Sequence, residues 1–214
     1  MATRLEFTLR FELISGLHTT GDRAELWTDR ALTLDWHEGK NPIVPATTIK
    51  GWLRENSEQV LRTIGQQVCD GSQPSSICGS CLVCRVFGHP KGKSPLIFFD
   101  GGFTEPLIDT RTNVSLSRRR RTAYEERLFT AEVAWGETLE VEGVGFFPNP
   151  QEAKEAAALL WLSAKAGFAL GASRSRGLGW LRFKEFEFKC DGKVVGEEEL
   201  QAMVNAWRGE RDEK

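Results

Sequence analysis

Leu170-Gly171-Ala172-Ser173-Arg174-Ser175-Arg176-Gly177-Leu178-Gly179-Trp180 is the stretch around which the chain is organised, and we call it the glycine loop. It follows an alanine-rich run with helical spacing and precedes an alternating run rich in phenylalanine, so the sequence predicts a helix, a tight turn and a strand. Glycine lets a backbone approach a ligand closely, and the planar guanidinium of arginine matches phosphate oxygens. The glycine loop is therefore either a turn with solvated arginines or a binding site for an anion such as a nucleic-acid backbone.

The sequence carries no nucleotide-binding fingerprint. The glycine loop lacks the Gly-Lys-Ser/Thr ending of a Walker loop, and it precedes a strand instead of opening a helix. Gly16 and Gly21 have the spacing of P-loop glycines, but Asp22 and Arg23 stand where lysine and serine or threonine are required. These departures argue against a nucleotide-dependent enzyme.

The composition is ordinary for a globular protein. Of the 214 residues, 40% are hydrophobic and 27% are charged, and the formal net charge is −2. This length suits one domain with insertions. Charge is unevenly spread, because Arg118–Arg121 form a basic run while acidic residues crowd the C-terminal tail. The N-terminus is unlike a signal peptide and no apolar run is long enough to span a membrane, so we expect a cytoplasmic protein.

Hydrophobic periodicity predicts a mixture of strands and helices. The clearest strand is 4–13, where apolar and polar residues alternate strictly, as in a half-buried strand. The predicted order is strand 4–13, helix 45–67, strand 96–103, strands 128–135 and 138–146 with a turn at Gly136, helix 149–169, strand 180–189 and a short helix 197–207. We expect Thr47 or Thr48 to cap the first helix. This order predicts an α+β fold of the ferredoxin-like (RRM-like) βαββαβ type, with insertions.

Four of the five cysteines are clustered in the sequence, at Cys69, Cys78, Cys81 and Cys84. Two short Cys-x2-Cys spacings with an upstream cysteine suit tetrahedral thiolate coordination of structural Zn²⁺. An iron–sulfur cluster is the alternative, although the downstream Cys-Pro of ferredoxins is missing. His89 is a candidate fourth ligand if one cysteine does not take part. Four thiolates leave no open position for a catalytic water, so a structural metal is favoured.

Two further groups of basic residues are candidates for phosphate contacts. Lys50 and Arg54 are four residues apart and share one face of the predicted helix. The arginine run Arg118–Arg121 lies in the middle of a polar segment, 111–127, that shows little periodicity. A run of like charges is usually a solvated loop, and four adjacent arginines repel one another unless an anion or an acidic partner offsets their charge. Glu125 and Glu126 are the alternative neutralising partners of that run.

The irregular segment 14–44 is rich in groups that could carry chemistry, namely His18, Asp22, Asp29, Asp35 and His37. Their spacing fits no standard metal site. Structureless loops of this length are usually functional or disordered, and Trp27 and Trp36 argue against disorder. The segment is therefore a candidate functional loop.

The chain resembles the RAMP superfamily, and specifically the repeating backbone subunit of type III CRISPR effector complexes. Five stretches in family order carry the resemblance over essentially the full length. They are Ser15-Gly16-Leu17-His18-Thr19-Thr20-Gly21, Pro45-Ala46-Thr47-Thr48-Ile49-Lys50-Gly51, Cys81-Leu82-Val83-Cys84-Arg85-Val86-Phe87-Gly88, Arg111-Thr112-Asn113-Val114-Ser115-Leu116-Ser117-Arg118, and the glycine loop.

The resemblance implies a single RAMP domain spanning 1–214, with a zinc-binding insertion at about 68–90 and a basic arm at about 108–127. It also implies a chain that polymerises along a CRISPR guide RNA, together with other copies of itself and other effector subunits. Complementary target RNA would then be recognised by base pairing, while the protein supports the backbone. Members of this family cut the target RNA at regular intervals in a step that requires a divalent cation, Mg²⁺ or Mn²⁺.

The resemblance also assigns roles to residues of this sequence. Asp29 falls on the position of the family's essential aspartate, with Asp35 or Asp22 as alternatives, and His18 is implied to position the loop near the cut. Cutting RNA can use the neighbouring 2′-hydroxyl as nucleophile, so one carboxylate can suffice as a base or metal ligand. The implied RNA contacts are Lys50, Arg54, Arg118, Arg119, Arg120, Arg121, Arg174 and Arg176.

Two other functions remain open from the sequence. Some RAMP subunits bind guide RNA and scaffold the complex without cutting. A zinc-dependent enzyme acting on its own is the third reading, and the four-thiolate ligand set argues against it because it leaves no open coordination position.

Overall fold

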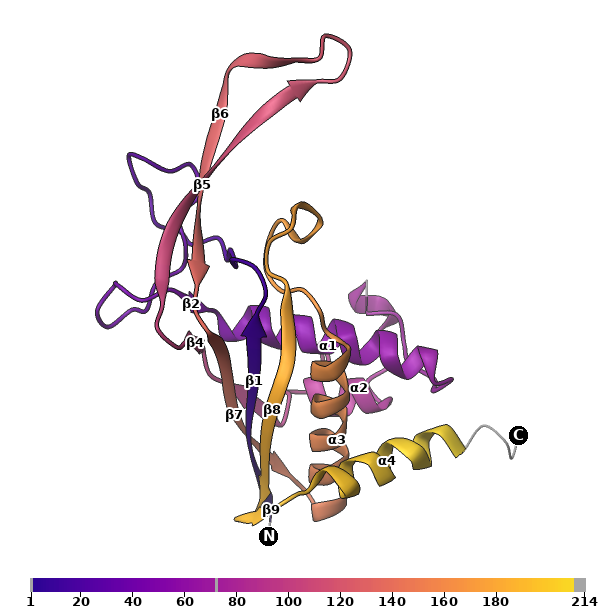
Figure 1. The fold of residues 1–214 in the computed structure, drawn as a ribbon. Helices are drawn as coiled ribbons and strands as arrows, with labels where there is room; N and C mark the ends of the chain where they lie inside the picture. The colour runs from indigo at the N-terminus through magenta and orange to yellow at the C-terminus, as the bar shows by residue number, and fades with distance from the viewer. Residues whose placement is uncertain (1, 72, 210–214) are drawn as a thin grey trace.

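The computed structural model describes residues 2–71 and 73–209, and the side chain of Glu126 lies outside the described part. Most elements contribute to one antiparallel sheet with helices on one of its faces (Figure 1). The strands are β1 (Thr3–Leu13), β2 (Ile43–Val44), β3 (Leu96–Phe98), β4 (Gly101–Phe103), β5 (Leu107–Ser117), β6 (Thr122–Trp135), β7 (Thr138–Phe147), β8 (Leu181–Cys190) and β9 (Lys193–Val194). The helices are α1 (Ala46–Thr63), α2 (Leu82–Phe87), α3 (Pro150–Ala166) and α4 (Glu197–Gly209).

The main sheet has the strand order β2-β4-β7-β1-β8-β9, with β3 also paired to β7. Strand β1 lies in the centre, antiparallel to both β7 and β8. Its apolar residues Leu5, Phe7, Leu9 and Phe11 are buried, which confirms the half-buried strand predicted from the alternation. Helix α3 packs against β1 and β8, and α1 and α4 pack against α3. Each large side chain buried in this layer contributes about 1.5–3 kcal/mol, so helices and sheet hold one another in place.

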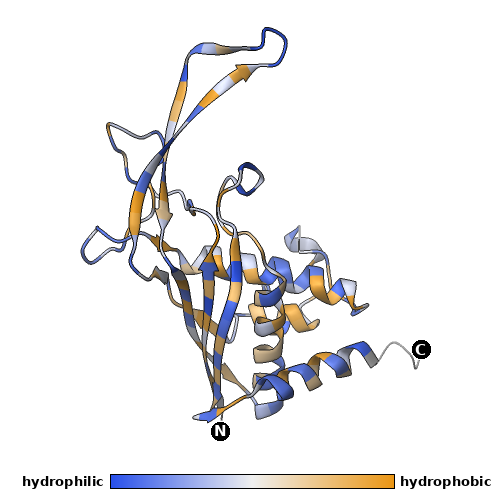
Figure 2. Cartoon of the chain, viewed as in Figure 1, coloured by the Kyte–Doolittle hydropathy of each residue, from blue (hydrophilic) through white to orange (hydrophobic). Residues whose placement is uncertain are grey.

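The other face of the sheet carries charged side chains in ion pairs. Arg10 on β1 bridges Glu140 on β7 and Glu185 on β8, with nitrogen–oxygen distances of 2.6 and 3.5 Å. Figure 2 shows hydrophilic and hydrophobic residues alternating along these strands. The register between β1 and β8 shifts between Arg10 and Phe11, which leaves Lys184 unpaired. In the sequence the alternation of this strand slips near Lys184-Glu185, which predicts a bulge, and the register shift confirms it.

Strands β5 and β6 form a separate two-stranded hairpin that projects away from the main sheet (Figure 1). Most of the weakly periodic segment 111–127 lies within these two strands, which the sequence did not predict there. The strands predicted on both sides of Gly136 form as β6 and β7, but β6 pairs with β5 whereas β7 pairs with β1. The arginine run occupies the turn at the hairpin tip, where the backbone N–H of Arg121 donates to the carbonyl of Ser117 at 2.8 Å.

The helix ends show which caps can be read from local sequence. Asn149 caps α3 as its sequence predicts, because its side chain accepts a hydrogen bond from the backbone N–H of Glu152 at 2.9 Å. Helix α1 begins after Pro45 and has no side-chain cap from Thr47 or Thr48, so that prediction was wrong. The carboxylate of Asp100 accepts the N–H of Ala46 at 2.7 Å instead. None of the described helices is long and apolar enough to cross a membrane.

Candidate functional site

The segment around Asp29 lies along strand β6, at the base of the hairpin. Arg30 pairs with Ala131 in a parallel bridge, and the N–H of Asp29 donates to the carbonyl of Thr130 at 3.2 Å. In return, the N–H of Thr130 donates to the Asp29 carboxylate at 2.7 Å, and its hydroxyl donates at 3.4 Å. Asp29 is exposed. Its carboxylate is thus fixed on one side by Thr130 and open to solvent on the other.

A buried polar network beneath this segment holds it to the hairpin. The carboxylate of Glu132 on β6 forms an ion pair with Arg23 and accepts the N–H of Leu32 at 2.9 Å. The imidazole of His18 contacts the carbonyl of Glu132 through Nδ1 at 2.6 Å and the hydroxyl of Thr20 through Nε2 at 3.1 Å. His18 is only 1% exposed, so it supports the segment from below and does not reach the surface.

The glycine loop is joined to the same segment by its backbone. The N–H of Ala172 donates to the carbonyl of His18, and the N–H of Gly179 to that of Gly16, both at 2.8 Å. Gly171 and Gly179 have positive φ angles of 88° and 72°. A Cβ would lie 2.5 Å from the carbonyl oxygen of His18 at Gly171, and 1.8 Å from that of Leu170 at Gly179. Only glycine permits both the left-handed backbone and these close approaches.

These connections bring three arginines from three segments around one small pocket. Arg30, Arg111 on β5 and Arg176 in the glycine loop line it, with His18 and Ser173 also contributing. Within 2–71 and 73–209, no ion pair within 4 Å involves any of the three guanidinium groups. Unneutralised arginines that converge from separate segments are suited to bind an anion such as phosphate. We call the set Asp29, Thr130, Arg30, Arg111 and Arg176 the Asp29 surface.

Of the arginines in the Asp29 surface, only Arg176 was among the predicted RNA contacts. Arg30 and Arg111 were missed as binding residues, because their proximity depends on the parallel bridge to β6 and on the β5–β6 pairing. The available signals were that Arg30 follows Asp29 directly and that Arg111 opens one of the motifs.

The other predicted RNA contacts are distributed over three places. Arg174 is exposed and lies 3.7 Å from Glu55. Lys50 is half-buried on α1, where burial and, secondly, the charge of Arg54 lower its pKa. Arg54 donates to the Glu58 carboxylate at 3.2 Å and to the carbonyl of Gly88 at 3.0 Å, so it also connects α1 to the segment after α2.

The arginine run Arg118–Arg121 is exposed at the hairpin tip, away from the Asp29 surface at its base. Among the described side chains, no ion pair joins the run to Glu125 or to any other acid, while the side chain of Glu126 lies outside the description. The structure thus places the run at the hairpin tip, whereas Arg176 lines the pocket at the hairpin base together with Arg30, the residue after Asp29.

The two alternative aspartates differ in their surroundings. Asp35 accepts hydrogen bonds from the N–H groups of Glu38, Gly39 and Asn41 at 2.6, 3.2 and 2.9 Å. These backbone donors, with that of Glu38 first, lower the pKa of Asp35. Asp35 therefore organises its own turn. Asp22 is exposed, and among the described residues it has no hydrogen bond to Thr130 like that of Asp29.

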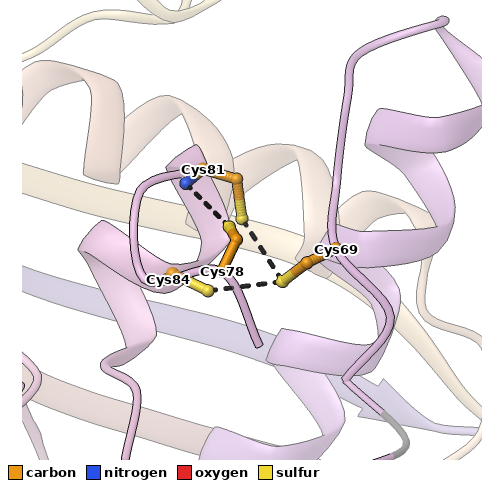
Figure 3. A group of neighbouring side chains, drawn as sticks. All are labelled: Cys69, Cys78, Cys81 and Cys84. Atoms are coloured by element: carbon orange, nitrogen blue, oxygen red, sulfur yellow. Dashed lines mark hydrogen bonds between the residues drawn. The ribbon is translucent and has the colours of Figure 1, made fainter. Parts of the chain in front are cut away.

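The four clustered cysteines converge beside the C-terminal end of α1, as the spacing predicted (Figure 3). Their sulfur atoms all lie within 4.8 Å of one another, and Cys69 Sγ is 3.4 Å from Cys84 Sγ and 3.7 Å from Cys81 Sγ. A tetrahedral zinc ion with bonds of 2.3 Å needs sulfurs about 3.8 Å apart. The four cysteines are therefore close enough to bind a metal ion, and His89 does not belong to the group.

The electrostatics of the cysteine cluster favour a bound cation. The backbone N–H groups of Cys81 and Ser80 point at the sulfur of Cys78 and lower its pKa to about 6. Burial raises the pKa of Cys84 to about 12. A buried thiolate is costly alone, and a coordinated cation removes that cost. The remaining cysteine, Cys190, is buried at the end of β8 and is not part of the cluster.

The family model of the RAMP superfamily matches residues 10–182, so the chain belongs to the RAMP superfamily. No curated protein matches the sequence. The chain is similar to one in the cryo-EM structure of the Type III-B Cmr-beta bound to cognate target RNA, with a TM-score of 0.60 and 14% sequence identity. The match covers 87% of this chain and 61% of that chain, so this chain spans less than two thirds of its relative. At this identity the similarity shows the fold: a mixed α+β RAMP fold built on antiparallel sheets.

Proposed function

We propose that this chain is a guide-RNA-binding backbone subunit of a type III CRISPR effector complex and that it cleaves complementary target RNA at Asp29. It would act as an endoribonuclease only inside the cytoplasmic complex, bound to guide RNA, target RNA, other copies of itself and other effector subunits. Residues 1–214 would form one ferredoxin-like RAMP domain, with the insertion at about 68–90 and the basic arm at about 108–127. The antiparallel sheet with α1 and α3 on one face supports this assignment.

The observation that carries the proposal is the composition of the Asp29 surface. It places one exposed, oriented carboxylate next in sequence to Arg30, which lines one pocket with Arg111 and Arg176, and none of these three arginines has an acidic partner among the described side chains. Arginines can hold the phosphates of an RNA backbone, and the carboxylate can act as a base or hold a divalent cation, Mg²⁺ or Mn²⁺. The cation, when bound, would stabilise charge that develops on the phosphate. Because RNA supplies its own 2′-hydroxyl, the protein needs only to orient the phosphate.

Other residues would support this chemistry without taking part in it. The buried His18 would position the segment that carries Asp29, through its contacts with Glu132 and Thr20. Lys50, Arg54 and Arg174, together with Arg176, would contact the guide backbone, and Arg118–Arg121 would contact RNA at the hairpin tip. Such contacts add affinity at any sequence, as a guide-binding scaffold requires.

We also propose that the cysteine cluster holds a structural zinc ion. The sulfur separations and the four-thiolate ligand set fit tetrahedral Zn²⁺, and a closed ligand set leaves no position for a reactive water. This argues against the chain acting alone as a zinc-dependent enzyme. The ion would fix the insertion against α1, next to the hydrogen bond from Arg62 to the carbonyl of Cys69 at 2.8 Å.

The proposal is tested by changing Asp29 to Ala in the reconstituted complex. Removal of a catalytic base or metal ligand typically lowers a rate by about 10²–10⁴-fold, and we expect a loss of that size. Guide and target binding should be unchanged, because the arginines remain. The matched controls are Asp22→Ala and Asp35→Ala in the same loop, which should cut normally. Cutting at the usual positions by Asp29→Ala complexes would overturn the assignment of Asp29.

A second candidate function is a RAMP subunit that binds guide RNA and scaffolds the complex without cutting. The two hydrogen bonds from Thr130 to the Asp29 carboxylate favour it, because they also suit a purely structural aspartate. Under this alternative, the wild-type complex binds target RNA with full affinity and leaves it intact at this subunit in Mg²⁺ and in Mn²⁺.

A further inference from the structure

Two large apolar side chains stand exposed two and three residues before Asp29. Glu25 and Thr28 pair in an antiparallel bridge, so Leu26 and Trp27 occupy the turn between them. Leu26 is 100% exposed and Trp27 is 65% exposed. Such turns normally hold glycine, asparagine, aspartate, proline or serine, and the fold gains nothing from an exposed tryptophan there. The position is therefore open to a contact outside the chain.

Trp27 and Asp29 are both hydrogen-bonded to Thr130. The hydroxyl of Thr130 donates to the carbonyl of Trp27 at 3.1 Å, while its N–H donates to the Asp29 carboxylate at 2.7 Å. Two residues of extended chain span at most about 7 Å, which is comparable with the distance from a phosphate to its base within one nucleotide. The backbone of Trp27 and the carboxylate of Asp29 are thus both held by Thr130, within a span of nucleotide size.

The charges around this span favour RNA over protein as the partner. Arg30 follows Asp29, and Arg111 and Arg176 line the same pocket, all without an acidic partner in the described part of the chain. Arginines that hold phosphates beside an aromatic ring that stacks on bases are the usual combination for binding single-stranded nucleic acid.

We propose that Trp27 stacks on a base of the target RNA next to the phosphate that Asp29 faces, and so holds that nucleotide for cleavage. The inference rests on the proposed function and deepens it, because it names the contact that orients the substrate strand. Stacking does not depend on base identity, since every base offers a π face. The contact therefore suits a protein whose sequence choice is made by the guide.

The same loop supplies a matched control. Trp36 is 81% exposed, and the centroid of its ring lies 3.8 Å from the centroid of the His37 ring. It belongs to the turn organised by Asp35 and has no contact with Thr130 or Asp29 among the described residues. Trp36→Ala removes an equally large exposed ring without touching the span that carries Asp29.

The first measurement is single-turnover cleavage of complementary RNA by the reconstituted complex. Loss of one base–aromatic stack should slow cutting by Trp27→Ala about tenfold or more. Trp27→Phe should restore most of the rate, because phenylalanine still stacks, and Trp36→Ala should cut at the wild-type rate. A Trp27→Ala complex that cuts normally overturns the proposal. So does a Trp27→Ala chain that no longer assembles with its partner subunits, which would make Trp27 a protein contact.

The second measurement does not depend on cleavage. Target RNA carrying 5-iodouridine is irradiated in the complex, and the crosslinked peptide is identified by mass spectrometry. A crosslink from Trp27 to the target strand supports stacking even if Asp29→Ala still cuts, so the two proposals can fail separately. A crosslink to the guide strand only, or none to Trp27 at any uridine position, overturns the proposal.

Discussion

The cysteine cluster and the Asp29 surface are built in opposite ways. The cysteine cluster comes from one short stretch, and its sulfur atoms face one another. The Asp29 surface comes from the segment after β1, the hairpin and the glycine loop, and its charged groups face outward. A closed set of ligands holds structure together, whereas an open set of oriented charges is available to a ligand.

Replacing Cys84 with Ser should remove the metal and destabilise the insertion. The variant keeps three thiolates and places a hydroxyl at the most buried position of the cluster. Structural zinc contributes about 10–16 kcal/mol of apparent binding free energy in small zinc-finger peptides, so the loss of the ion should cause the largest stability change. Elemental analysis and thermal unfolding of the full chain measure the two effects.

The control for this variant is Cys190→Ser, which also changes a buried thiol but lies outside the cluster. It should retain one equivalent of zinc. Complexes that still assemble with Cys84→Ser should cut RNA at the normal rate, because no cysteine belongs to the Asp29 surface. Wild-type protein purified without zinc or any other metal would contradict the prediction.

Replacing Glu132 with Gln should loosen the Asp29 segment from the hairpin. The Glu132 side chain is 6% exposed and pairs with Arg23, so the change leaves a partly buried guanidinium with Glu25, at 3.3 Å, as its remaining acidic partner. Breaking a buried pair costs about 3–5 kcal/mol, and we expect about 3 kcal/mol or less because Arg23 is 33% exposed and keeps Glu25. Urea unfolding gives the free energy. Glu12→Gln, which breaks a surface pair with Arg182, should change it little.

The cleavage rate should also show that Glu132→Gln loosens the Asp29 segment. If the Glu132 network only positions Asp29, then Glu132→Gln should slow cutting without weakening target binding. A variant that unfolds more easily yet cuts at the wild-type rate would show that the segment does not need this support.

Replacing Arg111 or Arg176 with Ala should weaken RNA binding at every sequence. Each removes one phosphate contact, so the slope of log K against log salt should fall by about 0.7–0.9 per arginine. Filter binding at several salt concentrations measures the slope. Arg182→Ala, which removes an arginine already paired with Glu12, is the control and should leave the slope unchanged. An unchanged slope in Arg176→Ala would restore the interpretation of the glycine loop as a solvated turn.

The sequence predicted what depends on near neighbours. The alternation in β1, the bulge at Lys184, the cap at Asn149 and the spacing of the cysteines each involve residues close together in the chain. It failed where the partner is distant, because Asp100, 54 residues from Ala46, replaces the expected cap of α1.

The distinction between near and distant partners also explains which residues of the candidate site could be predicted. Asp29 and Arg176 could be named from motifs, because motifs preserve residue types along the chain. Arg30, Arg111 and Thr130 could not be named from local pattern, because only the parallel bridge beside β6 brings them together. Hydrogen bonds between backbones of distant segments leave no mark in residue type, so such partners follow from the fold alone.

The smallest effect is expected at Asp35, which is half-buried and whose carboxylate accepts hydrogen bonds from its own turn. Its backbone donors lower its pKa in the folded protein from the usual 3.8. A depressed pKa means that the turn is stabilised above that usual value and loses this stabilisation as the pH falls through the lowered one. An NMR titration should therefore place the midpoint of Asp35 below 3.8. Asp35→Asn should lower the melting temperature slightly at pH 7 and leave cleavage unchanged. Equal loss of cleavage in Asp35→Asn and Asp29→Ala would place the Asp35 turn in the reaction site. Asp35 would then face the RNA as Asp29 is proposed to do, instead of only stabilising its turn.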